Sequence, residues 1–137
     1  SMAALKVAKE NARLNQIKNV TFQHGDWLAA LEDKSQFDMI VSNPPYIKND
    51  DHHLQQGDVR FEPASALQAG SEGLDDLQRI IKNASPRLKP GGWLLLEHGN
   101  DQKAAVMQLL QQAGYEQVED YLDLADQPRV AVGSKPL

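Results

Sequence analysis

The chain has 137 residues, of which 41% are hydrophobic and 24% are charged, and its formal net charge is −5. This length and composition are typical of one soluble globular domain. The absence of cysteine excludes disulfides, thiolate nucleophiles and cysteine-ligated zinc, and no apolar run approaches the roughly 18 residues that a membrane span needs. The acidic balance argues against general nucleic-acid binding. We therefore expect a cytoplasmic protein with a single compact domain.

The first part of the chain predicts a helix, a strand and a short helix. Residues 3–15 are rich in alanine and place apolar side chains at helical spacing. Residues 19–24, NVTFQH, alternate apolar and polar side chains as a strand does, and a short helix follows at 27–31. The opening Ser1-Met2 resembles a remnant of cleavage before an internal start. We expect residues 3–137 to form part of a longer domain.

The middle of the chain contains two apolar runs that predict buried strands. Residues 37–41, FDMIV, read as a strand covered on both faces, and WLLLE at 93–97 reads as a second one. Between them, residues 47–72 show no sustained period, which indicates a long loop. A helix is predicted over 74–88, kinked or restarted near Ser85 by Pro86, with a turn at 90–92.

The last third predicts a helix and a hairpin. The helix covers residues 101–113 and stops at Gly114, and YEQVEDYLD and PRVAVG form the two strands that follow. Alternating strands and helices followed by a hairpin indicate an α/β sheet that is parallel in the middle and antiparallel at one edge.

A distinctive tetrapeptide, Asn43-Pro44-Pro45-Tyr46, ends the first buried strand. Ligands of open α/β sheets bind beyond the carboxyl ends of the strands, so this turn is well placed for a site. Each proline fixes its own φ and restricts the residue before it, which makes a rigid corner. A plain turn is the alternative interpretation, because all of these residue types except tyrosine favour turns.

The corner is chemically suited to a planar NH2 group. The side-chain oxygen of Asn43 and the carbonyl of Pro44 can each accept a hydrogen bond from one N–H of this group, and the ring of Tyr46 can stack on its plane. An amide nitrogen is a poor nucleophile because its lone pair is delocalised. Acceptors aimed at its two protons orient it and stabilise the positive charge that develops when it attacks.

The motif SNPPY resembles the [NDS]-P-P-[YFW] signature of class I methyltransferases that methylate planar nitrogens with S-adenosylmethionine. With HLQQGDVRFEPASAL and GGWLLLEHG, the chain resembles the release factor glutamine methyltransferases, the HemK or PrmC family, over residues 3–133. The resemblance implies a Rossmann-like sheet and methylation of the glutamine amide in the Gly-Gly-Gln loop of peptide chain release factors, which would be the partner proteins.

The resemblance also implies the site residues. Asn43 and Pro44 would bind the substrate amide and carry catalysis, with Pro45 and Tyr46 shaping the slot. Asp26 would meet the adenine amino group of the cofactor, Trp27 would lie beside the base, and Asn43 would also face the cofactor. The segment RFEP at 60–63 would have a structural or substrate-loop role, with an ion pair of Arg60 or Glu62 as the alternative.

The beginning of the chain departs from that family. The family binds its cofactor with a glycine-rich loop after the first strand and an acidic residue after the second, and the sequence contains no Gly-x-Gly-x-Gly run. In the family's strand order, 3-2-1-4-5-7-6, the chain would lack strands 1 and 2, which would leave exposed sheet edges that favour self-association. The helical domain that helps to recognise the release factor would also be missing. We expect this polypeptide alone to bind the cofactor weakly or not at all.

Other features support weaker hypotheses. His52 and His53 beside two aspartates suggest a metal site, but adjacent histidines in an irregular loop rarely converge on one ion, so no metal is expected. His98 ends a strand, and a structural role is expected for it rather than that of a base; Glu97 and Asp123 are given no catalytic role. Two alternatives to the main interpretation stay open, namely methylation of adenine in nucleic acid and a non-catalytic fragment that binds a partner.

Overall fold

The computed structural model describes residues 1–31, 36–45 and 74–137, and these residues belong to two compact units. The first unit spans Ser1–Asp33 and the second Lys34–Leu137. The whole of the predicted long loop at 47–72, which includes the segment 60–63, lies outside the described residues, as does Tyr46. In the described part of the chain, no helix combines the length and the apolar character that crossing a membrane requires.

The first unit begins with helix α1, Met2–Leu14, which confirms the predicted helix. The hydroxyl of Ser1 caps it by accepting a hydrogen bond from the backbone N–H of Ala4 at 3.3 Å. Arg13 in the last turn pairs with Glu10 at 2.6 Å, one turn earlier on the helix. None of the residues of α1 is buried. The predicted short helix is the 3-10 helix η1, Trp27–Ala30.

The predicted strand over residues 19–24 was wrong, because these residues form no strand. Alternation of side chains sets which face of a strand is apolar, but a strand also requires a neighbour for its backbone N–H and C=O groups. In this segment Val20 remains 43% exposed, and the strands that the structure describes all lie in the second unit. Residues 19–24 therefore have the alternation typical of a strand, but no described strand lies beside them to pair with their backbone.

The second unit is built on a four-stranded sheet of β1, β2, β4 and β3, in that order. Their bounds are Phe37–Ser42, Leu88–Glu97, Pro128–Ser134 and Glu116–Leu122, respectively. Strands β1 and β2 are parallel, whereas β4 is antiparallel to both β2 and β3. This arrangement confirms the predicted mixed sheet with its hairpin edge, and it equals the 4-5-7-6 part of the order implied by the resemblance.

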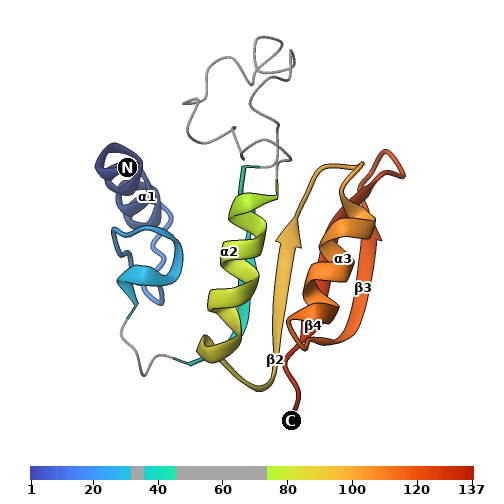
Figure 1. Cartoon of the computed structure of the whole chain (residues 1–137). Helices are drawn as coiled ribbons and strands as arrows, with labels where there is room; N and C mark the ends of the chain where they lie inside the picture. Colours follow the sequence, from blue (N-terminus) through green and yellow to red (C-terminus); the bar gives the residue numbers. More distant parts are fainter. Residues whose placement is uncertain (32–35, 46–73) are drawn as a thin grey trace. The chain divides into compact units, whose positions relative to one another are not determined.

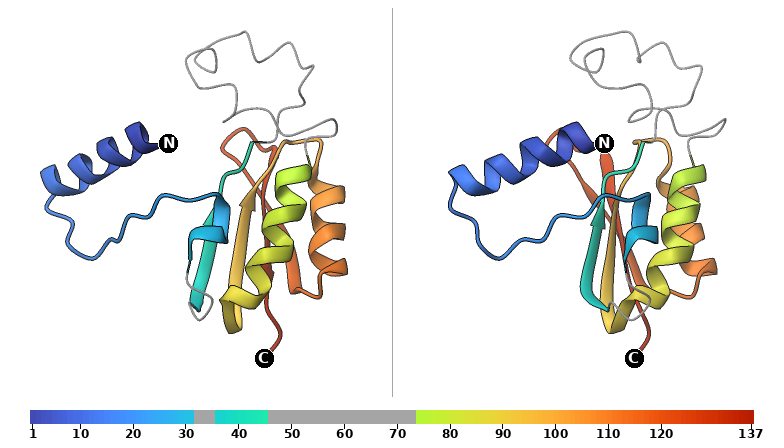
Figure 2. Two further views of the ribbon diagram at one scale, coloured as in Figure 1. Left: turned by 60° about the vertical axis from the view of Figure 1, so that its left-hand side comes forward. Right: turned by 90° about the vertical axis from the view of Figure 1, so that its left-hand side faces the viewer.

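Two helices, α2 at Asp75–Ala84 and α3 at Lys103–Gln112, lie on one face of this sheet (Figures 1 and 2). The predicted break near Ser85 is the 3-10 turn η5, Ser85–Arg87, which contains Pro86. The core between the helices and the sheet consists of fully buried apolar side chains, among them Leu77, Leu88, Leu94, Leu96, Val106 and Leu110. Burying such side chains supplies the main free energy of folding for this unit.

The expectation that β1 is covered on both faces was wrong. Ile40 faces the helices and is 8% exposed, whereas Met39 and Val41 on the other face are 52% and 69% exposed. Within the second unit, α2 and α3 both lie on the same face of the sheet, so these helices cover only one side of the apolar run of β1. A continuous apolar run is typical of a strand that is buried on both faces, so the sequence of β1 has the pattern without the second layer in this unit.

The predicted turn at 90–92 is instead part of β2, which runs unbroken from Leu88 to Glu97. The strand accommodates it as a bulge: Phe37 pairs with Leu88 and Met39 with Trp93, so that β2 carries the extra residues. Gly91 adopts a left-handed φ of +73°. A Cβ on Gly92 would lie 3.1 Å from the carbonyl oxygens of both Phe37 and Asp38. The two glycines therefore permit a bulge where a chain reversal was expected.

Candidate functional site

The candidate site lies at the carboxyl ends of β1 and β2. These strands are parallel and pair Ser42 with Leu96, so the residues that follow Ser42 emerge beside the end of β2. Asn43 comes directly after β1 and is exposed, whereas Pro44 and Pro45 are buried. Pro44 is among the fully buried side chains of the protein. The two prolines are thus anchored, and the only polar side chain of the three is presented to solvent at the edge where α/β sheets bind ligands.

The described part of the corner has the properties that methylation of a planar nitrogen would need. An exposed asparagine offers a side-chain oxygen as acceptor, and a proline offers a backbone carbonyl as acceptor while it has no N–H to donate. The fixed φ values of the prolines reduce the rearrangement that binding would require. Tyr46, which was predicted to stack on the substrate, lies outside the described residues, as do His52, His53, Arg60 and Glu62.

The two residues predicted to meet the adenine of the cofactor lie in the first unit. Asp26 is exposed and occupies the N-cap position of η1, and its carbonyl accepts the N–H of Ala29 at 3.0 Å. Trp27 is half-buried and has a φ of +50°, a conformation that is unusual for a bulky side chain and is often found at functional sites. Asn43 belongs to the second unit. The cofactor-binding role of these three residues remains a prediction.

A buried polar cluster at the end of β2 was not predicted. The side chain of His98 is fully buried; its Nδ1 lies 2.8 Å from the carbonyl oxygen of Gly99, and its Nε2 lies 2.6 Å from Oδ2 of Asp120. A carbonyl oxygen can only accept, so Nδ1 carries a hydrogen and donates it. A second hydrogen is shared between Nε2 and the carboxylate. Both ring nitrogens are therefore engaged inside the protein, and the ring cannot act as a base on a bound substrate.

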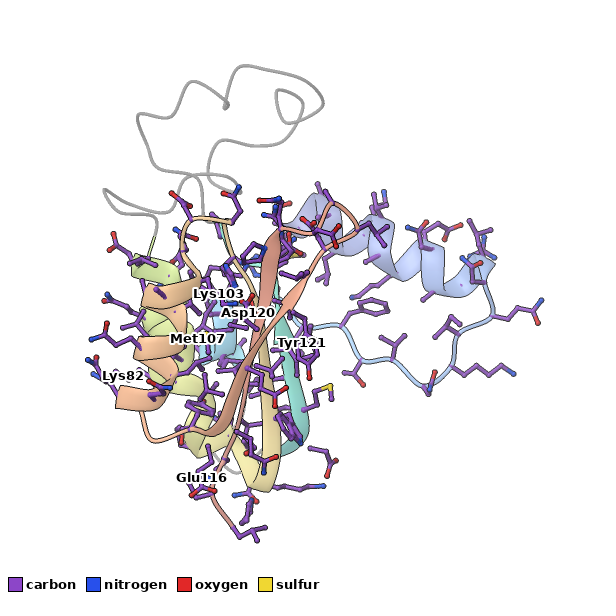
Figure 3. All side chains as sticks on the ribbon, turned by 90° about the vertical axis from the view of Figure 1, so that its right-hand side faces the viewer. Lys82, Lys103, Met107, Glu116, Asp120 and Tyr121 are labelled. Carbon is purple, nitrogen blue, oxygen red and sulfur yellow. The ribbon has the colours of Figure 1, made fainter. Side chains whose placement is uncertain are left out.

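Asp120 reaches His98 across the intervening strand. It lies on β3 and pairs with Ala131 of β4, which in turn pairs with Leu96 of β2. The carboxylate is only 1% exposed, and Nζ of Lys103 lies 3.7 Å from its Oδ1, an ion-pair distance without a hydrogen bond. Lys103 projects from α3 towards Asp120 (Figure 3). No local pattern in the sequence indicates this cluster, because Asp120 is 22 residues from His98 and only the hairpin brings them together.

The turn of the hairpin is tied to the same end of β2. Arg129 donates from Nη1 to the carbonyl oxygen of His98 and from Nε to Oδ2 of Asp123, at 3.1 Å in each case. Oδ1 of Asp123 accepts the backbone N–H groups of Ala125 and Gln127, at 2.8 and 3.0 Å. These two N–H groups, together with Arg129, hold the pKa of Asp123 below its usual range. Asp123 therefore stabilises the hairpin turn, and its contacts give it no role in catalysis.

Comparison with known proteins agrees with this geometry. The sequence profile of a family described as a methyltransferase domain matches residues 1–127. Proteins named release factor glutamine methyltransferase are 51% identical in Xylella fastidiosa, 47% in Coxiella burnetii and 49% in Escherichia coli, over 99%, 98% and 95% of this chain. These matches cover 49%, 48% and 47% of the relatives, so the chain spans about half the length of the curated relatives it matches.

Solved structures support the fold. A methyltransferase from Pyrococcus furiosus superposes with a TM-score of 0.71, covering all of this chain and 60% of the other at 19% identity. A ribosomal protein L11 methylase from Lactobacillus delbrueckii subsp. bulgaricus gives a TM-score of 0.67, also at 19% identity, over 98% of this chain and 55% of the other. At this level of identity the likeness is one of fold alone.

Proposed function

This chain belongs to the methyltransferase domain family, and from that membership we propose that it forms part of an enzyme that methylates peptide chain release factors. The methyl group of S-adenosylmethionine is transferred to the side-chain amide nitrogen of the glutamine in their Gly-Gly-Gln loop. The single observation that carries the proposal is the Asn43 corner, in which an exposed amide is mounted on two buried prolines at the carboxyl end of a parallel strand. The names of the relatives supply the substrate class.

In the proposed mechanism, the side-chain oxygen of Asn43 and the carbonyl oxygen of Pro44 each accept a hydrogen bond from one N–H of the substrate amide. Held in this way, the nitrogen is oriented towards the methyl group, and the charge that develops on it is stabilised as the new N–C bond forms. A bound cofactor would supply the methyl group as an electrophile, and its sulfonium sulfur would take the electrons of the S–C bond that breaks. The methylated nitrogen then loses a proton to water, so no strong base is required.

The residues present fit only part of such a cofactor. Asp26 can accept from the adenine amino group and Trp27 can pack beside the base, as proposed roles, and both are accessible in the first unit. The sequence has no Gly-x-Gly-x-Gly run to approach the methionine portion. We therefore propose that these 137 residues alone bind S-adenosylmethionine weakly or not at all, and that activity belongs to a full-length enzyme, meaning a protein that carries this chain at the length of its relatives.

The test of the function is methyl transfer by the full-length enzyme. Incubation with labelled S-adenosylmethionine and a release factor is expected to place the label on the peptide that contains Gly-Gly-Gln, located by mass spectrometry. A release factor in which that glutamine is replaced by alanine is the matched control and is expected to stay unlabelled. Adenine-containing duplex DNA tests the alternative substrate of the same corner. Label on the DNA and none on the release factor would contradict the proposal.

A further inference from the structure

His98 acts on its surroundings through the groups to which it is bonded. Its backbone is fixed on both sides by Arg129, whose carbonyl accepts the N–H of His98 at 3.0 Å and whose guanidinium donates to the carbonyl of His98. The ring donates to the carbonyl oxygen of Gly99, which also accepts the backbone N–H of Gln102 at 2.9 Å, and the N–H of Gly99 donates to Oε1 of Gln102 at 2.9 Å. Both polar groups of the Gly99 backbone are therefore fixed by buried side chains.

The turn that begins at Gly99 borders the Asn43 corner. Ser42 pairs with Leu96 in the parallel register of β1 and β2, so Pro44 and His98 each follow that pair by two residues on neighbouring strands. Pro44 and His98 are both fully buried. Beyond them, residues 100–101 are exposed at the edge of the sheet where Asn43 is exposed. The orientation of the Gly99 peptide therefore decides where this turn lies beside the corner.

We propose that His98 is a positioning residue for methyl transfer, because its ring holds the Gly99 carbonyl and thereby places the turn at 100–101 as a wall of the substrate site. The inference rests on the proposed function. The role of the ring is distinct from that of Asn43, since the ring is fully buried and both of its nitrogens are bonded to protein groups.

Stability alone is a poor reason for this arrangement. A buried polar pair must recover the cost of leaving water, and apolar side chains of similar volume often serve a core equally well. Here the cost is increased because Oδ1 of Asp120 is buried without a hydrogen bond. What an apolar side chain in place of His98 could not supply is the N–H directed at Gly99. Asp120 in turn fixes the orientation of the ring by binding its other nitrogen.

Two substitutions separate the two bonds of the ring. Asparagine has its amide nitrogen near the place of Nδ1, so His98→Asn keeps the donor to Gly99 and leaves Asp120 without its partner. Glutamine reaches further, near the place of Nε2, so His98→Gln keeps the contact with Asp120 and removes the side-chain donor to Gly99, whose carbonyl then keeps only the backbone N–H of Gln102. The stability of each variant is expected to depend on whether the buried carboxylate of Asp120 keeps its hydrogen-bond donor. His98→Gln keeps that donor and should therefore have the higher unfolding temperature of the two.

Methyl transfer by the full-length enzyme is expected to follow the opposite order. His98→Gln should lower kcat by about 10- to 100-fold, the usual effect of a small misplacement near the reacting groups, with KM little changed. His98→Asn should retain the larger kcat although it is the less stable variant. If kcat follows thermal stability, so that His98→Gln is the more active, His98 is only a structural residue and the inference is overturned.

A second measurement tests the contact between the His98 ring and Gly99 without catalysis. In the 137-residue chain, the amide hydrogen of Gly99 is expected to exchange faster in His98→Gln than in His98→Asn, and equal rates would contradict the proposed hold. Failure of the proposed function would instead appear as absence of label on the release factor with the unsubstituted enzyme. The two failures are therefore distinguishable.

Discussion

Asn43 shows how much the residue types of a short motif determine about one side chain. Its motif predicted an acceptor on a rigid mount, and Asn43 is exposed beside the buried Pro44 and Pro45. The cluster around His98 could not be predicted in the same way. Its partner Asp120 is 22 residues away, and the two residues meet because β4 lies between β2 and β3 in the sheet, not because of any local spacing.

Asp123 offers a test of the electrostatics at a single side chain. Backbone N–H groups lower the pKa of its carboxyl in the folded protein, so the charged form stabilises the fold. This stabilisation is complete above the unfolded-state pKa of about 4 and is lost as the pH falls through the lower folded-state pKa. We expect Asp123→Asn to be less stable than the unsubstituted chain at neutral pH, with a difference that shrinks over this acidic window.

Urea unfolding of the two proteins between neutral and acidic pH measures that difference. Asp126→Asn, which removes an exposed carboxylate from the same turn, is the matched control and should not reproduce the pH dependence. A stability difference for Asp123→Asn that stays constant down to the lowest pH would show that the carboxylate charge contributes nothing to the turn.

Among the individual helices and strands, prediction succeeded where a local pattern is sufficient and failed where neighbours decide. Helix α3 ends as expected before Gly114, whose φ is +83°. Residues 19–24 have the period of a strand but form none, and Gly91 and Gly92 form a bulge inside β2 instead of a turn. In both failures the deciding factor was which backbone lay alongside, and a single sequence does not show this.

The hairpin also contains a close approach that can be tested. A Cβ on Gly133 of β4 would lie 3.0 Å from Cβ of Tyr115, which precedes β3. Tyr115 cannot easily move away, because it is buried and its hydroxyl donates to the carbonyl of Ile81 at 3.2 Å. We expect Gly133→Ala to lower the free energy of unfolding by about 1–3 kcal/mol, as overpacking of a core does. Denaturant unfolding that shows no loss would contradict this packing.

At the scale of the whole molecule, the second unit, Lys34–Leu137, has an apolar sheet face that its own described helices do not cover. Met39 and Val41 are exposed on β1, which lies at the edge of the described sheet and pairs there with β2. Unpaired backbone groups beside exposed apolar side chains favour association with another chain. The family resemblance led us to expect exposed sheet edges, but it did not indicate that Met39 and Val41 would be the exposed residues.

We therefore expect the 137-residue chain to associate with itself in a concentration-dependent way, as measured by sedimentation. The double substitution Met39→Lys and Val41→Lys should shift the protein towards the monomer, because charged side chains protect sheet edges. Leu124→Lys is the control, since Leu124 is a fully exposed apolar residue in the hairpin turn and not on β1. A monomeric mass at every concentration without any substitution would contradict the expectation.

The central claim is that Asn43 holds the substrate amide, and the most direct measurement is kcat for methylation of a release factor by the full-length enzyme carrying Asn43→Ala. Loss of one preorganised acceptor should lower kcat by about 100- to 1000-fold. Asn43→Asp, which keeps a side-chain oxygen, should retain more activity than Asn43→Ala, and Asn83→Ala, at an exposed position on α2, should match the unsubstituted enzyme. Equal labelling of the glutamine by the Asn43→Ala and unsubstituted enzymes would contradict the account.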